Sequence, residues 1–487
     1  MVVYTLKKYY WVVAVLVLCI PMVMLNTGDK QHWGDDFAQY LLQAKYISMG
    51  VSPYKTGFIA NADNTLPPMA PVGFSVLLVP VVALFGLNSM APFVMLMSLA
   101  FCLVMLLAAV IFKKHLSAGM AVLLVFVAFY PNFMFWMKLL ITSDVPFTVG
   151  LIVLLMLQLK RQNIYLSIVL GLLFGSLMLT RNVIIVMPFA MFASIVFKYI
   201  FYGEKLESVK WCVVQTSVGI LFYVVVTYFV FPSSVDYPSW AMGHLTLGKI
   251  GAIVKDNFFH YYANVVSLFT SHDGTMQHTS FAITVVFSLF FLLGFAKRLL
   301  KGDYWAFFTL AYLLLILSVN IVSDYRYLIP VHCFLVLFAA EGFLSLFRNK
   351  KVRLVLGIAT AVFFISIYKN HVEYLYSIRK EPLPGPTTVS AKEIFKFIKA
   401  NVDDKAVIVF PKPRALTLFT DKKTTINSWT KSPEESYTQL KNLGVHYFLK
   451  AHTTTDEKFD SVIGYCRPNL SVVFENNEFV LYHHAGH

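Results

Sequence analysis

The sequence predicts a polytopic α-helical membrane protein with a small folded domain at its C-terminal end. Of its 487 residues, 58% are hydrophobic and 14% are charged, whereas soluble domains carry about a quarter charged residues. Apolar runs long enough to cross a bilayer recur as far as residue 368. Beyond that point they give way to prolines, polar residues and short strand-like runs.

The apolar runs predict about eleven membrane-spanning helices. The first run leads into polar sequence without a small-residue cleavage site, so we interpret it as an uncleaved anchor rather than a signal peptide. The run at 71–87 is short and interrupted by prolines and glycines, which favours an interfacial or re-entrant segment. The expected spans cover residues 9–25, 91–112, 116–137, 145–159, 164–180, 183–201, 211–232, 279–296, 304–322, 327–347 and 352–368.

Basic residues are distributed unevenly between the two sets of loops that these spans define. The loops on the side of the N-terminus hold sixteen lysines and arginines, and the longer opposite loops hold eight. Because basic residues are enriched in cytoplasmic loops, we expect a cytoplasmic N-terminus and an extracytoplasmic C-terminal domain. Loop lysines facing anionic lipid headgroups account for the net charge of +14, which gives no reason to expect a nucleic acid partner.

Three parts are expected along the chain. Residues 1–368 form the transmembrane domain, in which residues 26–90 are a first external loop with interfacial helices. Residues 369–388 form a linker that prolines make stiff. Residues 389–487 are numerous enough to form a soluble α/β or α+β domain with a core of its own.

The expected soluble domain combines helices and strands. Ser390 and Glu393 match a capping box, which predicts a helix that ends near Ala400, and a second helix is expected at 433–443. Five cysteines are scattered without metal-like spacing, so we expect no disulfide and no structural zinc. Strand-like runs cover residues 406–410, 416–420, 445–449, 471–474 and 479–482.

Two adjacent acids, Asp35 and Asp36, follow the first span directly. They begin a stretch in which apolar residues recur at helical spacing, which predicts an amphipathic helix along the membrane surface. The acids would then lie at the boundary between water and lipid. The alternative is that one of them only caps the helix, because aspartate is favoured at that position. The apolar residues at this spacing are Phe37, Tyr40, Leu41, Ala44 and Ile47.

Three further charged residues, Asp144, Arg181 and Arg326, stand at the expected external ends of spans. An arginine fork binds phosphate oxygens in pairs, and a carboxylate beside it can accept the proton of a hydroxyl nucleophile. Together they fit group transfer from a lipid phosphate to an alcohol. The alternatives are that Asp144 caps a helix, and that the arginines reach lipid headgroups or, for Arg326, pair with Asp324.

In these residues the chain resembles the GT-C-class glycosyltransferases, in the branch that includes protein O-mannosyltransferases and lipid A aminoarabinose transferases. The resemblance spans nearly the whole membrane part. It rests on the order of several short motifs along the chain and on the side of the membrane where they are expected. It implies a GT-C-like membrane domain, located in the inner membrane of a bacterium. The motifs are Gly34–Phe37 with Tyr40, Leu66–Gly73, Ser143–Phe147, Thr180–Asn182 and Arg326–Pro330.

The resemblance also implies an activity. A sugar would move from a polyprenyl-phosphate donor to a hydroxyl of a lipid, protein or glycan on the extracytoplasmic face, with inversion of the anomeric carbon. Asp35 would be the catalytic base, with Asp36 and Asp144 in support. The residues expected to bind the donor phosphate are Arg181, Arg326 and Lys55, and those expected to contact sugar or acceptor are Tyr40, Tyr327 and Trp240.

The chain departs from the aminoarabinose branch at one point. That branch has an acid and a lysine before its proline pair, whereas this chain has Thr65 and Leu66. A phosphate lysine and a metal ligand are therefore missing, and Lys55 is the expected substitute for the lysine. A divalent metal stays an alternative, with His272 and Asp273 as candidate ligands, although no ligand spacing accompanies them.

Two other classes of function are consistent with a polytopic chain. A transporter or flippase of lipid-linked sugars predicts charged residues within the membrane and paired repeats with broken helices. The sequence has one such acid, Glu341, and no repeat. A scaffold whose soluble domain is the active part would not need acids gathered on the external side. Formation of a glycosidic product separates transfer from transport.

Overall fold

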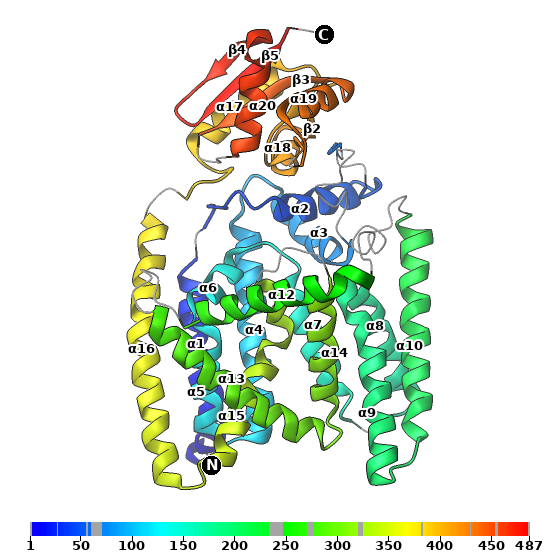
Figure 1. Ribbon diagram of the computed structural model, residues 1–487, viewed down its shortest axis with the longest axis vertical. Helices are drawn as coiled ribbons and strands as arrows, with labels where there is room; N and C mark the ends of the chain where they lie inside the picture. Colours follow the sequence, from blue (N-terminus) through cyan, green and yellow to red (C-terminus); the bar gives the residue numbers. More distant parts are fainter. Residues whose placement is uncertain are drawn as a thin grey trace.

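The protein has a tall helical bundle with a smaller mixed domain at one end (Figure 1). The N-terminus lies at the opposite end of the bundle, and the C-terminus lies in the small domain. The computed structural model describes residues 2–26, 28–54, 57–59, 71–160, 162–232, 247–269, 277–319, 325–380, 383–428, 430–452 and 456–485.

Helices occur at the position of every predicted span. Five described helices are long and apolar enough to cross a membrane, or six if one bent pair is counted as a span, so the number eleven stays a prediction. The bundle helices are α1 (Val2–Met24), α4 (Ala91–His115), α5 (Ala118–Phe129), α6 (Asn132–Leu139), α7 (Asp144–Leu157), α8 (Ile164–Met178), α9 (Val186–Tyr202), α10 (Glu207–Val225), α13 (Gln277–Leu299), α14 (Tyr304–Ser318), α15 (Ile329–Leu346) and α16 (Lys350–Lys380).

The span predicted at 116–137 is broken into α5 and α6, which meet at 75°. Pro131 stands at the break, as the N-cap of α6, where its ring and missing N–H disfavour a continuous helix. The break places Lys138 in the interior, where its ammonium group donates to the carbonyl of Met22 at 2.7 Å and to that of Leu25. The lysine thereby satisfies backbone acceptors that the C-terminal end of α1 leaves open.

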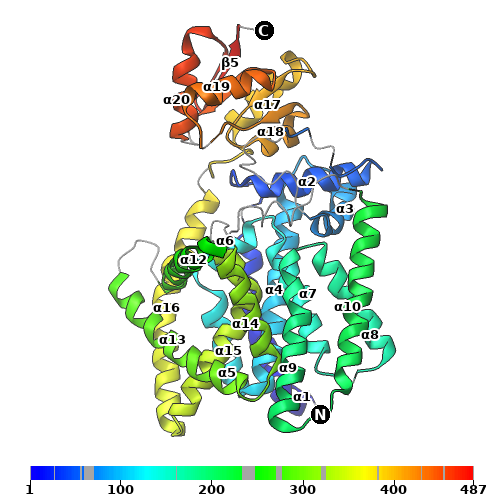
Figure 2. The ribbon, with the colours of Figure 1, turned by 45° about the vertical axis from the view of Figure 1, so that its right-hand side comes forward.

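A long helix, α12 (Leu247–Ser267), lies between the spans expected at 211–232 and 279–296, in what the sequence predicts to be an external loop. It runs across the bundle near the end that carries the small domain (Figures 1 and 2). Its Asn257 side chain donates to the carbonyls of Leu317 and Val319, both at 2.9 Å. These bonds fasten α12 over the end of α14, and the helix itself was not predicted.

Glu341 takes part in an ion-pair network away from that end of the bundle. Arg298 of α13 donates from Nε to the Glu341 carboxylate at 2.7 Å and from Nη1 to Asp303, just before α14, also at 2.7 Å. The neighbouring helices approach closely at Gly294, where an added Cβ would lie 1.9 Å from the Phe338 carbonyl oxygen. Glu341 therefore serves to join α13, α14 and α15.

The small domain is built on one five-stranded sheet with the order β2-β1-β3-β5-β4. β1 pairs in parallel with β2 and β3, while β5 pairs antiparallel with β3 and β4. The strands are β1 (Val407–Val409), β2 (Lys423–Thr425), β3 (Val445–Ala451), β4 (Leu470–Glu475) and β5 (Phe479–His484), and the helices are α17 (Val389–Asn401), α18 (Pro413–Thr420), α19 (Pro433–Asn442) and α20 (Glu457–Cys466).

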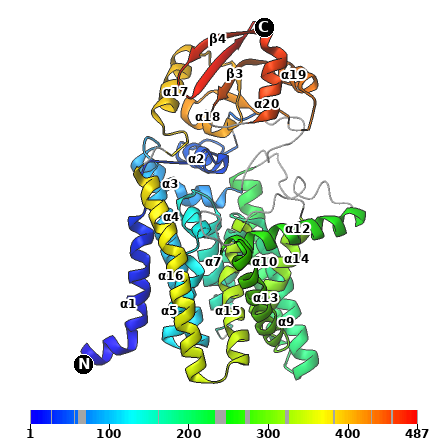
Figure 3. The ribbon, with the colours of Figure 1, turned by 60° about the vertical axis from the view of Figure 1, so that its left-hand side comes forward.

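Several expectations for this part of the chain were wrong in detail. Residues 416–420 form the end of α18 rather than a strand, and α20 was not predicted. The N-cap of α17 is Thr388, whose hydroxyl accepts from the Ala391 N–H, so the helix begins before the expected capping box. The helix expected to end at residue 368 continues to Lys380 as α16, which runs along the bundle (Figure 3).

Two helices of the first loop, α2 (Asp35–Ser48) and α3 (Gly73–Phe85), lie between the bundle and the small domain (Figure 2). Phe37 and Leu41 of α2 are buried, as the apolar spacing predicts, but so are Ala38 and Leu42. A helix at a free membrane surface would expose its second face. α2 is therefore covered on both sides, and the small domain rests on it.

We expect labelling with a membrane-impermeant thiol reagent to place the two ends of the bundle on opposite sides of the membrane. The five native cysteines are buried, so labelling should come from the introduced cysteine. Lys405→Cys, exposed in the small domain, should react in intact cells, whereas Lys350→Cys, exposed at the start of α16, should react only after the membrane is opened. The reverse pattern would contradict the loop-charge prediction.

Candidate functional site

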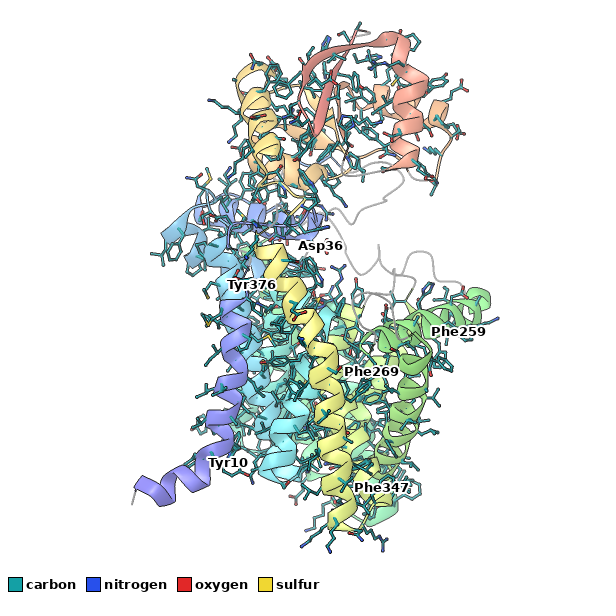
Figure 4. The ribbon with its side chains drawn as sticks, turned by 90° about the vertical axis from the view of Figure 1, so that its left-hand side faces the viewer. Tyr10, Asp36, Phe259, Phe269, Phe347 and Tyr376 are labelled. Carbon is teal, nitrogen blue, oxygen red and sulfur yellow. The ribbon has the colours of Figure 1, made fainter. Side chains whose placement is uncertain are left out.

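A carboxylate at the junction of the bundle and the small domain binds two arginines from distant parts of the chain. The Oδ2 atom of Asp36 lies 2.6 Å from Nη1 of Arg326, which belongs to the 3₁₀ turn Tyr325–Leu328 before α15. Its Oδ1 atom lies 3.7 Å from Nη1 of Arg414, in the first turn of α18. Figure 4 shows Asp36 beneath the small domain, far from Tyr10 and Phe347 at the other end of the bundle.

These two arginines determine the charge state of Asp36. Removal of water from this carboxylate would raise its pKa, but the guanidinium groups of Arg326 and Arg414 outweigh that effect and hold the pKa below its usual value. Asp36 is therefore ionised at neutral pH and is a weaker base than a free carboxylate. Its side chain is 43% exposed, which leaves this carboxylate reachable from solvent.

A second pair, between Asp144 and Arg181, lies deeper. Asp144 is the first residue of α7 and only 1% exposed, and one of its carboxylate oxygens contacts Nη1 of Arg181, which follows α8. The preceding Ser143 bonds through its hydroxyl to that of Tyr40, at 3.0 Å. Asp144 therefore has an ion-pair partner beyond any capping role, and Tyr40 connects α2 to the beginning of α7.

The ring of Tyr327 joins the two pairs. The guanidinium carbon of Arg181 lies 5.0 Å from the centre of this ring, and that of Arg326 lies 5.3 Å from it, both within the range of cation–π attraction. The Tyr312 hydroxyl donates to the Tyr327 carbonyl at 2.8 Å and holds the turn in place. Both arginines thus point at acids and an aromatic ring, which argues against a role only as headgroup anchors.

The start of α3 contacts the turn that carries Arg181. The N–H of Gly73 donates to the Leu179 carbonyl at 2.7 Å. A Cβ at residue 73 would lie 2.7 Å from that carbonyl and from the Thr180 hydroxyl, so glycine is needed for this approach. The described end of the proline-rich motif thereby supports the position of Arg181.

The structure leaves several predicted site residues untested. Asp35 is the first residue of α2, but its side chain lies outside the described part of the structure. Lys55 and Trp240 also lie outside it, as do Asp324 and the candidate metal ligands His272 and Asp273. Within the described ranges, no group of three or more His, Cys, Asp or Glu side chains could hold a metal ion.

Sequence reasoning missed three polar residues. Arg414 follows β1 in a segment that reads as an ordinary basic loop, and only the docking of the small domain on α2 brings it to Asp36. Gln39 and Thr142 are buried, and within the described ranges no hydrogen-bond partner is found for the Gln39 amide or the Thr142 hydroxyl. A buried polar group without a partner is costly, so these two are candidates to bind a substrate.

Loss of the Arg181 guanidinium would leave the buried Asp144 carboxylate without its cation. We expect Arg181→Ala to lower the free energy of unfolding by about 3–5 kcal/mol, measured by thermal unfolding of the purified protein in detergent. The matched double variant Arg181→Ala/Asp144→Asn also removes the buried negative charge and should recover much of the loss. Equal stability of wild type and Arg181→Ala would contradict a buried ion pair.

Comparison with known proteins finds similarity in structure. No protein-family model matches the chain, and no curated protein matches its sequence. The crystal structure of ArnT from Cupriavidus metallidurans bound to undecaprenyl phosphate is similar with a TM-score of 0.61 and 12% identity, covering 97% of this chain and 98% of that one.

Two structures of the oligosaccharyltransferase from Archaeoglobus fulgidus are also similar. The one tethered to an acceptor peptide has a TM-score of 0.62 and 11% identity over 92% of this chain and 69% of that one. The complex of that enzyme, AglB, with an inhibitory peptide and a dolichol-phosphate has a TM-score of 0.58 and 11% identity over 92% and 70%. The chain therefore has the fold of the GT-C glycosyltransferases, as the sequence motifs predicted.

Proposed function

We propose that this protein is an integral membrane glycosyltransferase that moves a sugar from a polyprenyl-phosphate donor to an acceptor hydroxyl. The observation that carries the proposal is the gathering of Asp36, Asp144, Arg181 and Arg326 around Tyr327 at one end of a GT-C fold. The acceptor is a lipid, a protein or another glycan on the extracytoplasmic face.

In this proposal the donor phosphate binds between Arg181 and Arg326. Their guanidinium carbons lie 5.0 and 5.3 Å from the centre of one aromatic ring, so a phosphate beside that ring would have both arginines near it, and a guanidinium group can bind phosphate oxygens in pairs. The lipid phosphates bound by ArnT and by AglB in their structures support a phosphate ligand. Lys55, in the same external loop as α2, is proposed as a further phosphate contact.

Asp35 is proposed as the base. It accepts the proton of the acceptor hydroxyl, whose oxygen attacks the anomeric carbon of the sugar from the face opposite the phosphate. The bond from that carbon to the phosphate oxygen breaks, the anomeric carbon is inverted, and polyprenyl phosphate leaves with its negative charge near Arg181 and Arg326. Asp36 suits this role less well, because its arginine partners lower its pKa and so weaken it as a base.

The remaining residues are proposed to position substrates. Asp144 fixes the direction of Arg181, and the ring of Tyr327 lies where the sugar would meet the arginines. Gln39 and Thr142 offer buried hydrogen-bonding groups for sugar hydroxyls. Tyr40 uses its hydroxyl to bind Ser143, so its contribution to substrate contact would come from its ring. Trp240 is retained as a candidate for sugar stacking.

The described residues do not fit a metal site, because Asp36 and Asp144 already have arginine partners and no larger group of ligands surrounds them in the described ranges. His272 and Asp273 are the residues to substitute if a chelating agent stops transfer. Since the oligosaccharyltransferase of Archaeoglobus fulgidus has been crystallised with zinc, this control belongs in the first assays.

We further propose that the site faces the extracytoplasmic side of a bacterial inner membrane, with membrane lipids surrounding the bundle. The connections α9–α10 and α15–α16 lie at the end remote from the small domain (Figure 1). They carry Lys205 and Arg348, and Lys350 begins α16, which favours a cytoplasmic location for that end. The acids and the small domain then lie outside.

The transporter alternative has less support. It expects intramembrane charges that bind cargo or ions, whereas Glu341, the acid on which it rested, is paired with Arg298. Mass spectrometry of lipid A, envelope proteins and surface glycans from a deletion strain, combined with the sidedness of the lipid-linked sugar, separates the two. We expect one glycosidic modification to be absent and its donor to accumulate on the extracytoplasmic face. Loss of the modification with the donor confined to the cytoplasmic face would favour transport.

The two adjacent acids give a sharper test. Asp35→Asn keeps the size and helix-capping ability of the side chain but removes the base, so we expect a loss of transfer of about a hundredfold or more with normal expression. Asp36→Asn should lose less. Sugar transfer is measured in membranes of the complemented deletion strain. Near wild-type transfer by Asp35→Asn with an inactive Asp36→Asn would assign the base to Asp36, and two active variants would contradict the proposed function.

A further inference from the structure

We propose that the small domain controls binding of the lipid phosphate through Arg414. This arginine shares the Asp36 carboxylate with Arg326 and so keeps Arg326 available to the phosphate. The inference rests on the proposed function, because it concerns the same phosphate site. It assigns a positioning role to a residue of the small domain, which would otherwise be an appendage of the membrane part.

The first support is the way Arg414 is held. The residue is 2% exposed, and its guanidinium carbon lies 5.3 Å from the ring centre of Phe58, which belongs to the first loop. Burial of a charged side chain is costly unless it is paired. The junction between the two parts of the protein therefore positions this guanidinium group against the Asp36 carboxylate.

The second support is that the first loop extends the sheet of the small domain. The N–H of Ile59 donates to the Thr424 carbonyl at 2.8 Å, and the N–H of Thr424 donates to the Gly57 carbonyl at 3.1 Å. Residue 58 thereby pairs in parallel with the edge strand β2. Strand addition of this kind fixes register through the backbone, so Phe58 and Arg414 are brought together reproducibly.

The third support is a packed contact before α2. Trp33 is buried, and its ring makes edge-to-face contacts with Phe395, Phe410 and Phe479 of the small domain, with centroids 5.6 to 6.4 Å apart. Such aromatic contacts add to the stability that burial of the rings already provides. The small domain is thus docked by an apolar core a few residues from Asp36.

The electrostatic consequence follows from sharing one carboxylate. With Arg414 near Oδ1 and Arg326 near Oδ2, two cations neutralise the Asp36 carboxylate. Without Arg414, neutralisation would depend more heavily on Arg326, and the less compensated negative charge would repel an incoming phosphate more strongly. Docking of the small domain therefore favours phosphate binding by Arg326. Arg181 also acts on the Asp36 carboxylate electrostatically, and Tyr40 lies within the influence of Asp36, Arg181 and Asp144.

The test uses the full chain in lipid nanodiscs and undecaprenyl phosphate as the probe, with affinity measured by native mass spectrometry. The variants are Arg414→Met, which keeps much of the apolar stem, Asp36→Asn, and the two combined. Lys45→Ala is the matched control, because Lys45 pairs with Asp421 across the same α2–α18 contact without touching Asp36.

We expect Arg414→Met to weaken binding of undecaprenyl phosphate by about fivefold or more, a typical size for coupling between sites. Asp36→Asn should bind at least as tightly as wild type, and Arg414→Met should have no further effect in that background. Lys45→Ala should bind as wild type does, since the junction is held mainly by its apolar core.

Other results would overturn the inference. Wild-type affinity in Arg414→Met would mean that Arg414 does not act on the phosphate site. If Arg414→Met weakened undecaprenyl phosphate binding just as much in the Asp36→Asn background, Arg414 would act directly on the phosphate or by holding the fold. If Asp36→Asn alone bound undecaprenyl phosphate weakly, the carboxylate would assist Arg326. If wild type itself fails to bind undecaprenyl phosphate, the proposed function fails instead.

Discussion

The ion pairs of Asp36 are the constraint on which the arrangement of this end of the protein depends. One carboxylate, at the start of a helix between two domains, meets guanidinium groups contributed by residues 326 and 414. Arg414 is buried, and its charge would be costly to desolvate without this carboxylate. Three features therefore depend on one another: the docking of the small domain, the position of α2 and the turn before α15.

The apolar bundle gives this polar site its location. Asp144 begins α7, Arg181 follows α8, and the two side chains form an ion pair. Gly73 allows α3 to pack against the turn that holds Arg181. At the level of Arg298 the bundle is joined by a separate network with Glu341 and Asp303. Charged side chains are thus confined to places where partners meet, as a low-dielectric surrounding requires.

Much of the fold and part of the site could be predicted from the sequence, because hydropathy marks helices and charged residues at their ends stand out. The pairing of Asp144 with Arg181 was missed because residues 37 apart in the chain become neighbours only when α7 and α8 pack. Arg414 was beyond prediction for a stronger reason: its contact with Asp36 depends on how the small domain docks on α2. The bend at Pro131 was missed because apolar content alone does not separate one long helix from two.

A structure of the full chain in a lipid nanodisc with undecaprenyl phosphate would test the central claim most directly. The account predicts phosphate density against the Arg326 and Arg181 guanidinium groups beside the Tyr327 ring, with the Asp36 carboxylate turned toward Arg414 beneath the docked small domain. A phosphate bound elsewhere, or bound here with the small domain displaced and Arg414 remote from Asp36, would contradict it.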